Sequence, residues 1–65
     1  MLKLFDINDY IEDTQQVKIL AYGITLYEGD ALHIPAGYCK YNLDTTQRRI
    51  YVDSNTHQIV ITLDC

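Results

Sequence analysis

Two segments of this chain predict β-strands that carry apolar side chains on both of their faces. In residues 16–22, the alternation of a strand places three apolar residues on one face and two on the other: Val17, Ile19 and Ala21 against Leu20 and Tyr22. In residues 58–63, it places three against one: Ile59, Ile61 and Leu63 against Val60. A sheet that is apolar on both faces must be covered on both.

A chain of 65 residues is too short to supply two covering layers. It makes one domain, residues 1–65, and its single predicted helix of about 8–10 residues cannot cover both faces of four strands spaced about 4.8 Å apart. Either the sheet curls on itself as a small barrel, or a second subunit supplies the missing layer. We expect the second solution, most simply a two-fold homodimer.

The expected fold is α+β, with a short N-terminal helix followed by a small antiparallel sheet of four to five strands. Asp6 can cap the helix, and Asp9 stands three residues later, where a capping box places its second polar side chain. Three residues at helical spacing give the helix an apolar side: Ile7, Tyr10 and Ile11. The helix reaches residues 13–16 at the longest.

β-branched and aromatic residues gather in five segments that predict strands: 16–22, 24–27, 38–43, 48–52 and 58–63. Gly23 separates the first two, which form a tight hairpin or one bent strand. The last two flank the polar loop 53–57 and make the most clearly predicted hairpin. Turns are predicted at 28–30 and 44–47. Residues 31–37 predict a loop with room for one helical turn, because Pro35 is excluded from a central strand.

The acidic residues of the chain concentrate near its N-terminus. The net charge is −4, and residues 1–13 carry four acids against Lys3 alone, so the remainder is nearly neutral. An acidic segment suits a basic protein surface through steering and complementarity. Alternatively, the acids solvate the start of the helix and favour its dipole. Arg48 and Arg49 form the only adjacent basic pair, and a strand points them to opposite faces, which disfavours direct nucleic-acid binding.

Tyrosine dominates the aromatic residues, with six tyrosines, one phenylalanine and no tryptophan. Tyrosine combines a rigid apolar ring with a polar tip, which suits a protein interface. Two other roles for the tyrosine rings remain as alternatives: cross-strand packing within the sheet, and stacking on a nucleic-acid base. The candidate protein-binding residues are Asp9, Glu12, Asp13, Tyr10, Tyr22, Tyr27 and Tyr51. The candidate residues for an anionic ligand are Arg48, Arg49, Tyr38 and Tyr41.

No pattern in the sequence predicts catalysis, a cofactor or a metal. His33, Cys39, His57 and Cys65 are separated by five, seventeen and seven residues, and these are not the close-paired spacings of a zinc site. A Cys39–His33 pair would have no orienting third group, and the three glycines form no phosphate-binding loop. We therefore expect a protein that is not an enzyme.

The sequence favours a cytoplasmic location without a membrane span. No apolar run approaches the ~20 residues that cross a bilayer. Asp6 and Asp9 interrupt the N-terminal apolar residues before they reach the length of a secretory signal. Only two cysteines occur, Cys39 and Cys65, so the chain lacks the disulfide framework of small secreted domains.

Residues 26–31, Leu-Tyr-Glu-Gly-Asp-Ala, are followed by Ile34 and Pro35, and this pattern resembles short accessory proteins of phages and prophages of Gram-positive bacteria. The resemblance covers residues 16–35 and, more loosely, the hairpin 48–63. It implies a genetic setting and carries no activity and no functional residue. Small acidic proteins of that setting resemble stoichiometric inhibitors of host defence, including anti-CRISPR and anti-restriction proteins.

Three functions follow as alternatives. The one we expect is a stoichiometric inhibitor or regulator of a host protein with a basic surface, such as a defence protein. The second is an oligomer that sequesters an anionic nucleotide signal at its subunit interfaces. The third is a minor structural or assembly factor.

Overall fold

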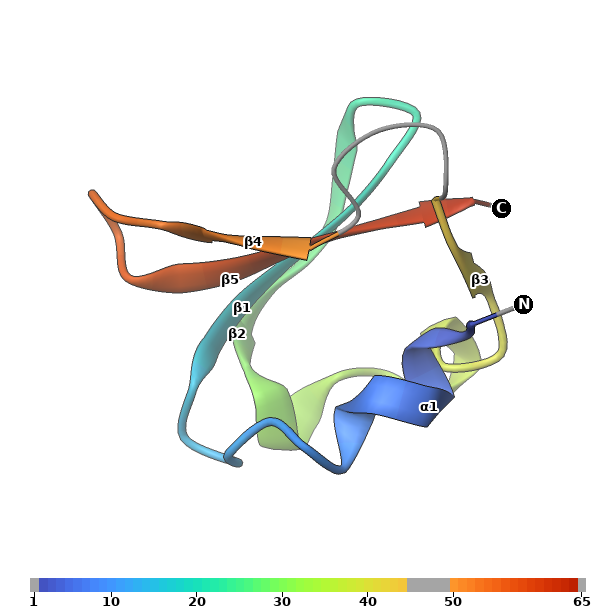
Figure 1. The fold of residues 1–65 in the computed structure, drawn as a ribbon, viewed down its shortest axis with the longest axis horizontal. Coiled ribbons are helices and arrows are strands. Elements are labelled where there is room, and N and C mark those ends of the chain that lie inside the picture. The colour runs from blue at the N-terminus through green and yellow to red at the C-terminus, as the bar shows by residue number, and fades with distance from the viewer. Residues whose placement is uncertain (1, 45–49, 65) are drawn as a thin grey trace.

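The computed structural model describes residues 2–44 and 50–64, and within these ranges the chain forms five strands, one short helix and two 3-10 turns (Figure 1). In chain order the elements are α1 (Leu4–Asn8), β1 (Gln16–Ala21), β2 (Ile24–Asp30), η1 (Ala31–His33), η2 (Ala36–Tyr38), β3 (Asn42–Leu43), β4 (Ile50–Asp53) and β5 (Gln58–Asp64). A short N-terminal helix and a sheet of four to five strands are therefore confirmed.

The sheet is mixed, because its two central strands run parallel. β1 pairs in parallel with β5, with Val17 beside Ile59 and Ile19 beside Ile61. β2 pairs antiparallel with the other side of β1, while β4 and β3 pair antiparallel with successive parts of β5. The predicted antiparallel pairing is confirmed for β1–β2, β3–β5 and β4–β5, and the β1–β5 pair departs from it by running parallel. These two strands are apolar on both faces, and placing them side by side keeps both away from the sheet edges.

The β1–β2 hairpin closes through two residues with positive φ. Tyr22 has φ 54° and Gly23 has φ 75°, which is the geometry of a two-residue type I′ turn. β2 then continues through residues 28–30, where the sequence predicted a turn. Gly29 allows this, because a Cβ at that position would lie 2.9 Å from the Tyr27 hydroxyl oxygen.

The β4–β5 hairpin confirms the most clearly predicted part of the fold. Its strands meet at the pair Asp53–Gln58, and residues 54–57 form the loop. Asp53 organises this loop: its side-chain Oδ1 accepts from the Asn55 N–H at 2.9 Å, and its carbonyl accepts from the His57 N–H at 2.7 Å. Arg48 and Arg49, predicted to begin the first strand of this hairpin, lie outside the described residues.

The helix is shorter than predicted and begins earlier. Lys3 is its N-cap, and Asp6 is its third residue, where Oδ2 accepts a hydrogen bond from the Lys3 N–H at 2.7 Å. The prediction that Asp6 is the N-cap is therefore wrong. The predicted apolar side is also corrected at Tyr10, which is exposed. Leu4 is fully buried, and Ile7 and Ile11 pack against the core.

Residues 38–43 predicted a strand, but only Asn42 and Leu43 form one. The preceding residues make tight turns and lie against the start of α1. The carbonyls of Cys39 and Tyr41 accept from the N–H groups of Phe5 and Leu4, at 2.9 and 3.1 Å. The first N–H groups of a helix have no partner within it, so this segment satisfies them in place of a sheet neighbour.

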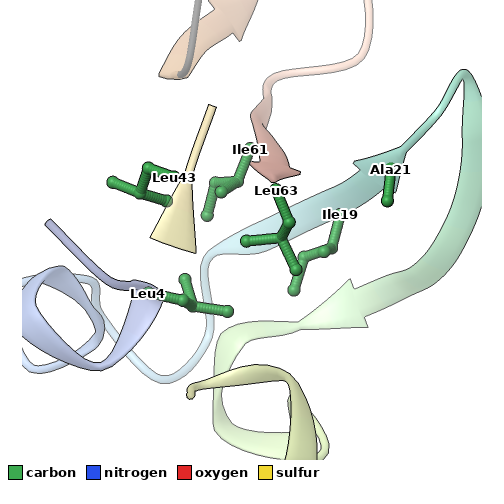
Figure 2. Packing of buried hydrophobic residues seen from close by; sticks show 6 residues of the cluster. All are labelled: Leu4, Ile19, Ala21, Leu43, Ile61 and Leu63. Atoms are coloured by element: carbon green, nitrogen blue, oxygen red, sulfur yellow. The ribbon is translucent and has the colours of Figure 1, made fainter. Parts of the chain in front are cut away.

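The core lies between the central strands β1 and β5, the short edge strand β3 and the helix α1, which covers it. Figure 2 shows six buried side chains converging from these elements: Leu4, Ile19, Ala21, Leu43, Ile61 and Leu63. Val60 points to the opposite face of β5 and is also buried, between its ladder neighbours Lys18 and Tyr51. The chain thus supplies a covering layer for one face of the central strands.

Candidate functional site

The most exposed aromatic side chain of the described residues is Tyr10, at 88%, and Phe5, five residues earlier in the sequence, is exposed at 67%. Large aromatic side chains in solvent are typical of contact surfaces. Both belong to residues 5–13, which also contain Asp6, Asp9 and two further acids. We call residues 5–13 the acidic–aromatic segment.

Helical spacing explains why these side chains point outward. Leu4 and Ile7 turn toward the core, so the neighbouring Phe5 and Asp6 face solvent. The turn continues beyond α1, because the Tyr10 N–H donates to the Ile7 carbonyl at 3.0 Å.

The carboxylates of this segment are exposed and form no ion pair with another described residue. Asp9, Glu12 and Asp13 are all exposed, and none of them forms an ion pair within residues 2–44 and 50–64. Asp6 is also exposed and accepts its hydrogen bond from the Lys3 backbone N–H, and it forms no ion pair among the described residues. Residues 5–13 therefore combine exposed negative charges with two exposed aromatic side chains.

The backbone of the segment is fixed to the rest of the fold. The Asp13 carbonyl accepts from the Leu32 N–H at 3.1 Å, and the Gln15 carbonyl accepts from the Ala31 N–H at 2.9 Å. These bonds hold the C-terminal end of the acidic–aromatic segment against η1. The first residues of the segment belong to α1, which packs on the core. A contact surface that is ordered before binding loses less entropy on association.

Leu32 extends this surface with another exposed apolar side chain. Its backbone bond to Asp13 places it beside the end of the acidic–aromatic segment. Sequence reasoning missed both Leu32 and Phe5. The spacing of Leu4, Ile7 and Ile11 was a signal that Phe5 lies off the buried side, whereas no pattern in the loop singled out Leu32.

The structure does not bring the seven candidate protein-binding residues into one site. Asp9, Tyr10, Glu12 and Asp13 are neighbours, whereas Tyr22 lies in the β1–β2 turn at the far end of the molecule from α1 (Figure 1). Tyr51 is exposed on β4. Tyr27 is half-buried, and its hydroxyl donates to the Asp30 carbonyl at 2.6 Å, which gives it a structural contact.

The candidate anion-binding tyrosines are engaged in packing. Tyr38 is half-buried against the core, and its hydroxyl donates to the Leu26 carbonyl at 3.4 Å. Tyr41 packs on the same core, and the Lys40 Nζ lies 5.5 Å from the centre of its ring. Arg48 and Arg49, the other two members of this set, lie outside the described residues.

In the part of the chain that the structure describes, no three His, Cys, Asp or Glu side chains gather closely enough to hold a metal ion. His33 and His57 are exposed at separate places in the fold, and Cys39 is a half-buried free thiol. Among the described residues, there is also no helix with the length and apolar character of a membrane span.

Comparison of the chain with protein-family models, with curated proteins and with solved structures gave no match. The assignment of a function therefore depends on the residues and geometry described above.

Proposed function

We propose that this chain is a non-enzymatic binding protein that inhibits or regulates a host protein, and that the acidic–aromatic segment makes the contact. The observation that carries the proposal is the exposure of Tyr10 and Phe5 among carboxylates that have no cationic partner in the described ranges. Such a surface fits a partner with basic residues around an apolar hollow.

The two kinds of side chain have separate tasks in this proposal. Tyr10 and Phe5 anchor the complex, because an aromatic ring buries a large apolar area and has few rotamers to lose. Asp9, Glu12 and Asp13 attract the basic partner before contact and increase the association rate. The backbone hydrogen bonds of the segment support both tasks, because they fix the main chain that carries these side chains.

The resemblance to phage and prophage accessory proteins supports the biological part of the proposal. In that setting the partner is a cytoplasmic defence protein, and the chain acts in a stoichiometric complex, as an anti-CRISPR or anti-restriction protein does. Proteins of this kind work by occupying a functional surface, which a chain of 65 residues can do without a catalytic site.

Site-specific photo-crosslinking tests the contact. Tyr10 is replaced by p-benzoylphenylalanine and the protein is irradiated in a lysate of a Gram-positive bacterium. Asn55, which is exposed in the β4–β5 loop, carries the same group in the control. We expect an adduct with one host protein from position 10 and none from position 55. Equal adducts from both positions, or none from position 10, would contradict the proposal.

The captured protein is then purified and assayed with the unmodified chain. We expect its activity to fall in proportion to the added chain, with an end point set by the stoichiometry of the complex. A nucleotide that raises the Tm of the chain, with no adduct at position 10, would support nucleotide sequestration instead. Unchanged activity at saturating chain would contradict inhibition.

A further inference from the structure

We draw no further inference here: the strongest candidate, the apolar surface patch that Val52 and its cross-strand neighbour Ile59 form on one face of the β4–β5 hairpin, carries nothing because nothing in the structure shows what covers it.

Discussion

Gln58 donates a hydrogen bond from Nε2 to Oε2 of Glu28, at 2.6 Å, across the width of the intervening strand β1. Gln58 is buried, and its Oε1 accepts from the Thr56 hydroxyl at 3.0 Å. At the same end of the sheet, the Gln15 Nε2 donates to the His57 carbonyl at 2.9 Å. These bonds join the β4–β5 hairpin to Glu28 in the β1–β2 hairpin and to Gln15, which precedes β1.

Replacement of Gln58 by alanine tests this connection. We expect Gln58→Ala to lower the free energy of unfolding by about 1–3 kcal/mol, because it removes a buried side chain that bonds two partners. Glu28→Gln keeps a carbonyl oxygen as acceptor and is expected to cost less than half as much. Urea denaturation gives both values. Equal losses in the two variants would mean that the Gln58 amide contributes nothing specific.

Gly29 is expected to be intolerant of a side chain. Gly29 has φ 157°, a backbone conformation that residues with a side chain rarely adopt, and a Cβ there also meets the Tyr27 hydroxyl oxygen at 2.9 Å. Gly29→Ala is therefore expected to destabilise the fold by about 1–3 kcal/mol. Gly37→Ala is the control, because a Cβ there meets no atom within 4 Å, and its effect stays within about 0.5 kcal/mol. Thermal denaturation measures both.

The same contact predicts coupling between Gly29 and Tyr27. Tyr27→Phe removes the oxygen that a Cβ at position 29 would strike, so the double variant is less destabilised than the sum of the single variants. Additive losses would contradict a direct steric conflict between the two residues.

Leu4 and Phe5 are adjacent and are expected to differ in their effect on stability. Leu4 is fully buried in the core, and Leu4→Ala costs about 2–5 kcal/mol. Phe5 is 67% exposed, and Phe5→Ala changes stability by no more than about 0.5 kcal/mol while weakening binding to the captured partner. Chemical denaturation separates the two roles. A loss for Phe5→Ala as large as for Leu4→Ala would remove Phe5 from the proposed contact surface.

Local patterns in the sequence predicted the hairpins but not the pairing of distant strands. Gly23 and the polar loop 53–57 mark turns that the chain forms within a few residues. The parallel β1–β5 pair joins segments about 40 residues apart. The sequence of neither strand indicates which strand it pairs with, or whether the pair is parallel or antiparallel. Residues 38–43 have strand-forming composition, but the carbonyls of Cys39 and Tyr41 accept hydrogen bonds from the first N–H groups of α1 instead of from a strand neighbour.

Residue types predicted part of the candidate site, and packing decided the rest. The acids of residues 9–13 are exposed as their charge requires. Tyr10 was predicted both as an apolar helix residue and as a contact residue. In the structure α1 packs on the core through Leu4 and Ile7, and this packing leaves Tyr10 exposed to solvent. Tyr27 was predicted as an interface residue for the same reason, because it is a tyrosine. In the structure its ring packs against the core and its hydroxyl donates to the Asp30 carbonyl.

Association kinetics with the captured host protein test the central claim most directly. Glu12→Gln with Asp13→Asn removes two negative charges from the acidic–aromatic segment. Thr25→Lys with Asn55→Lys makes the same change in net charge at exposed positions elsewhere. We expect the first pair to lower the association rate constant at low salt by at least about tenfold and the second pair to leave it nearly unchanged. An equal effect of both pairs, or no effect of the first, would contradict the proposed contact.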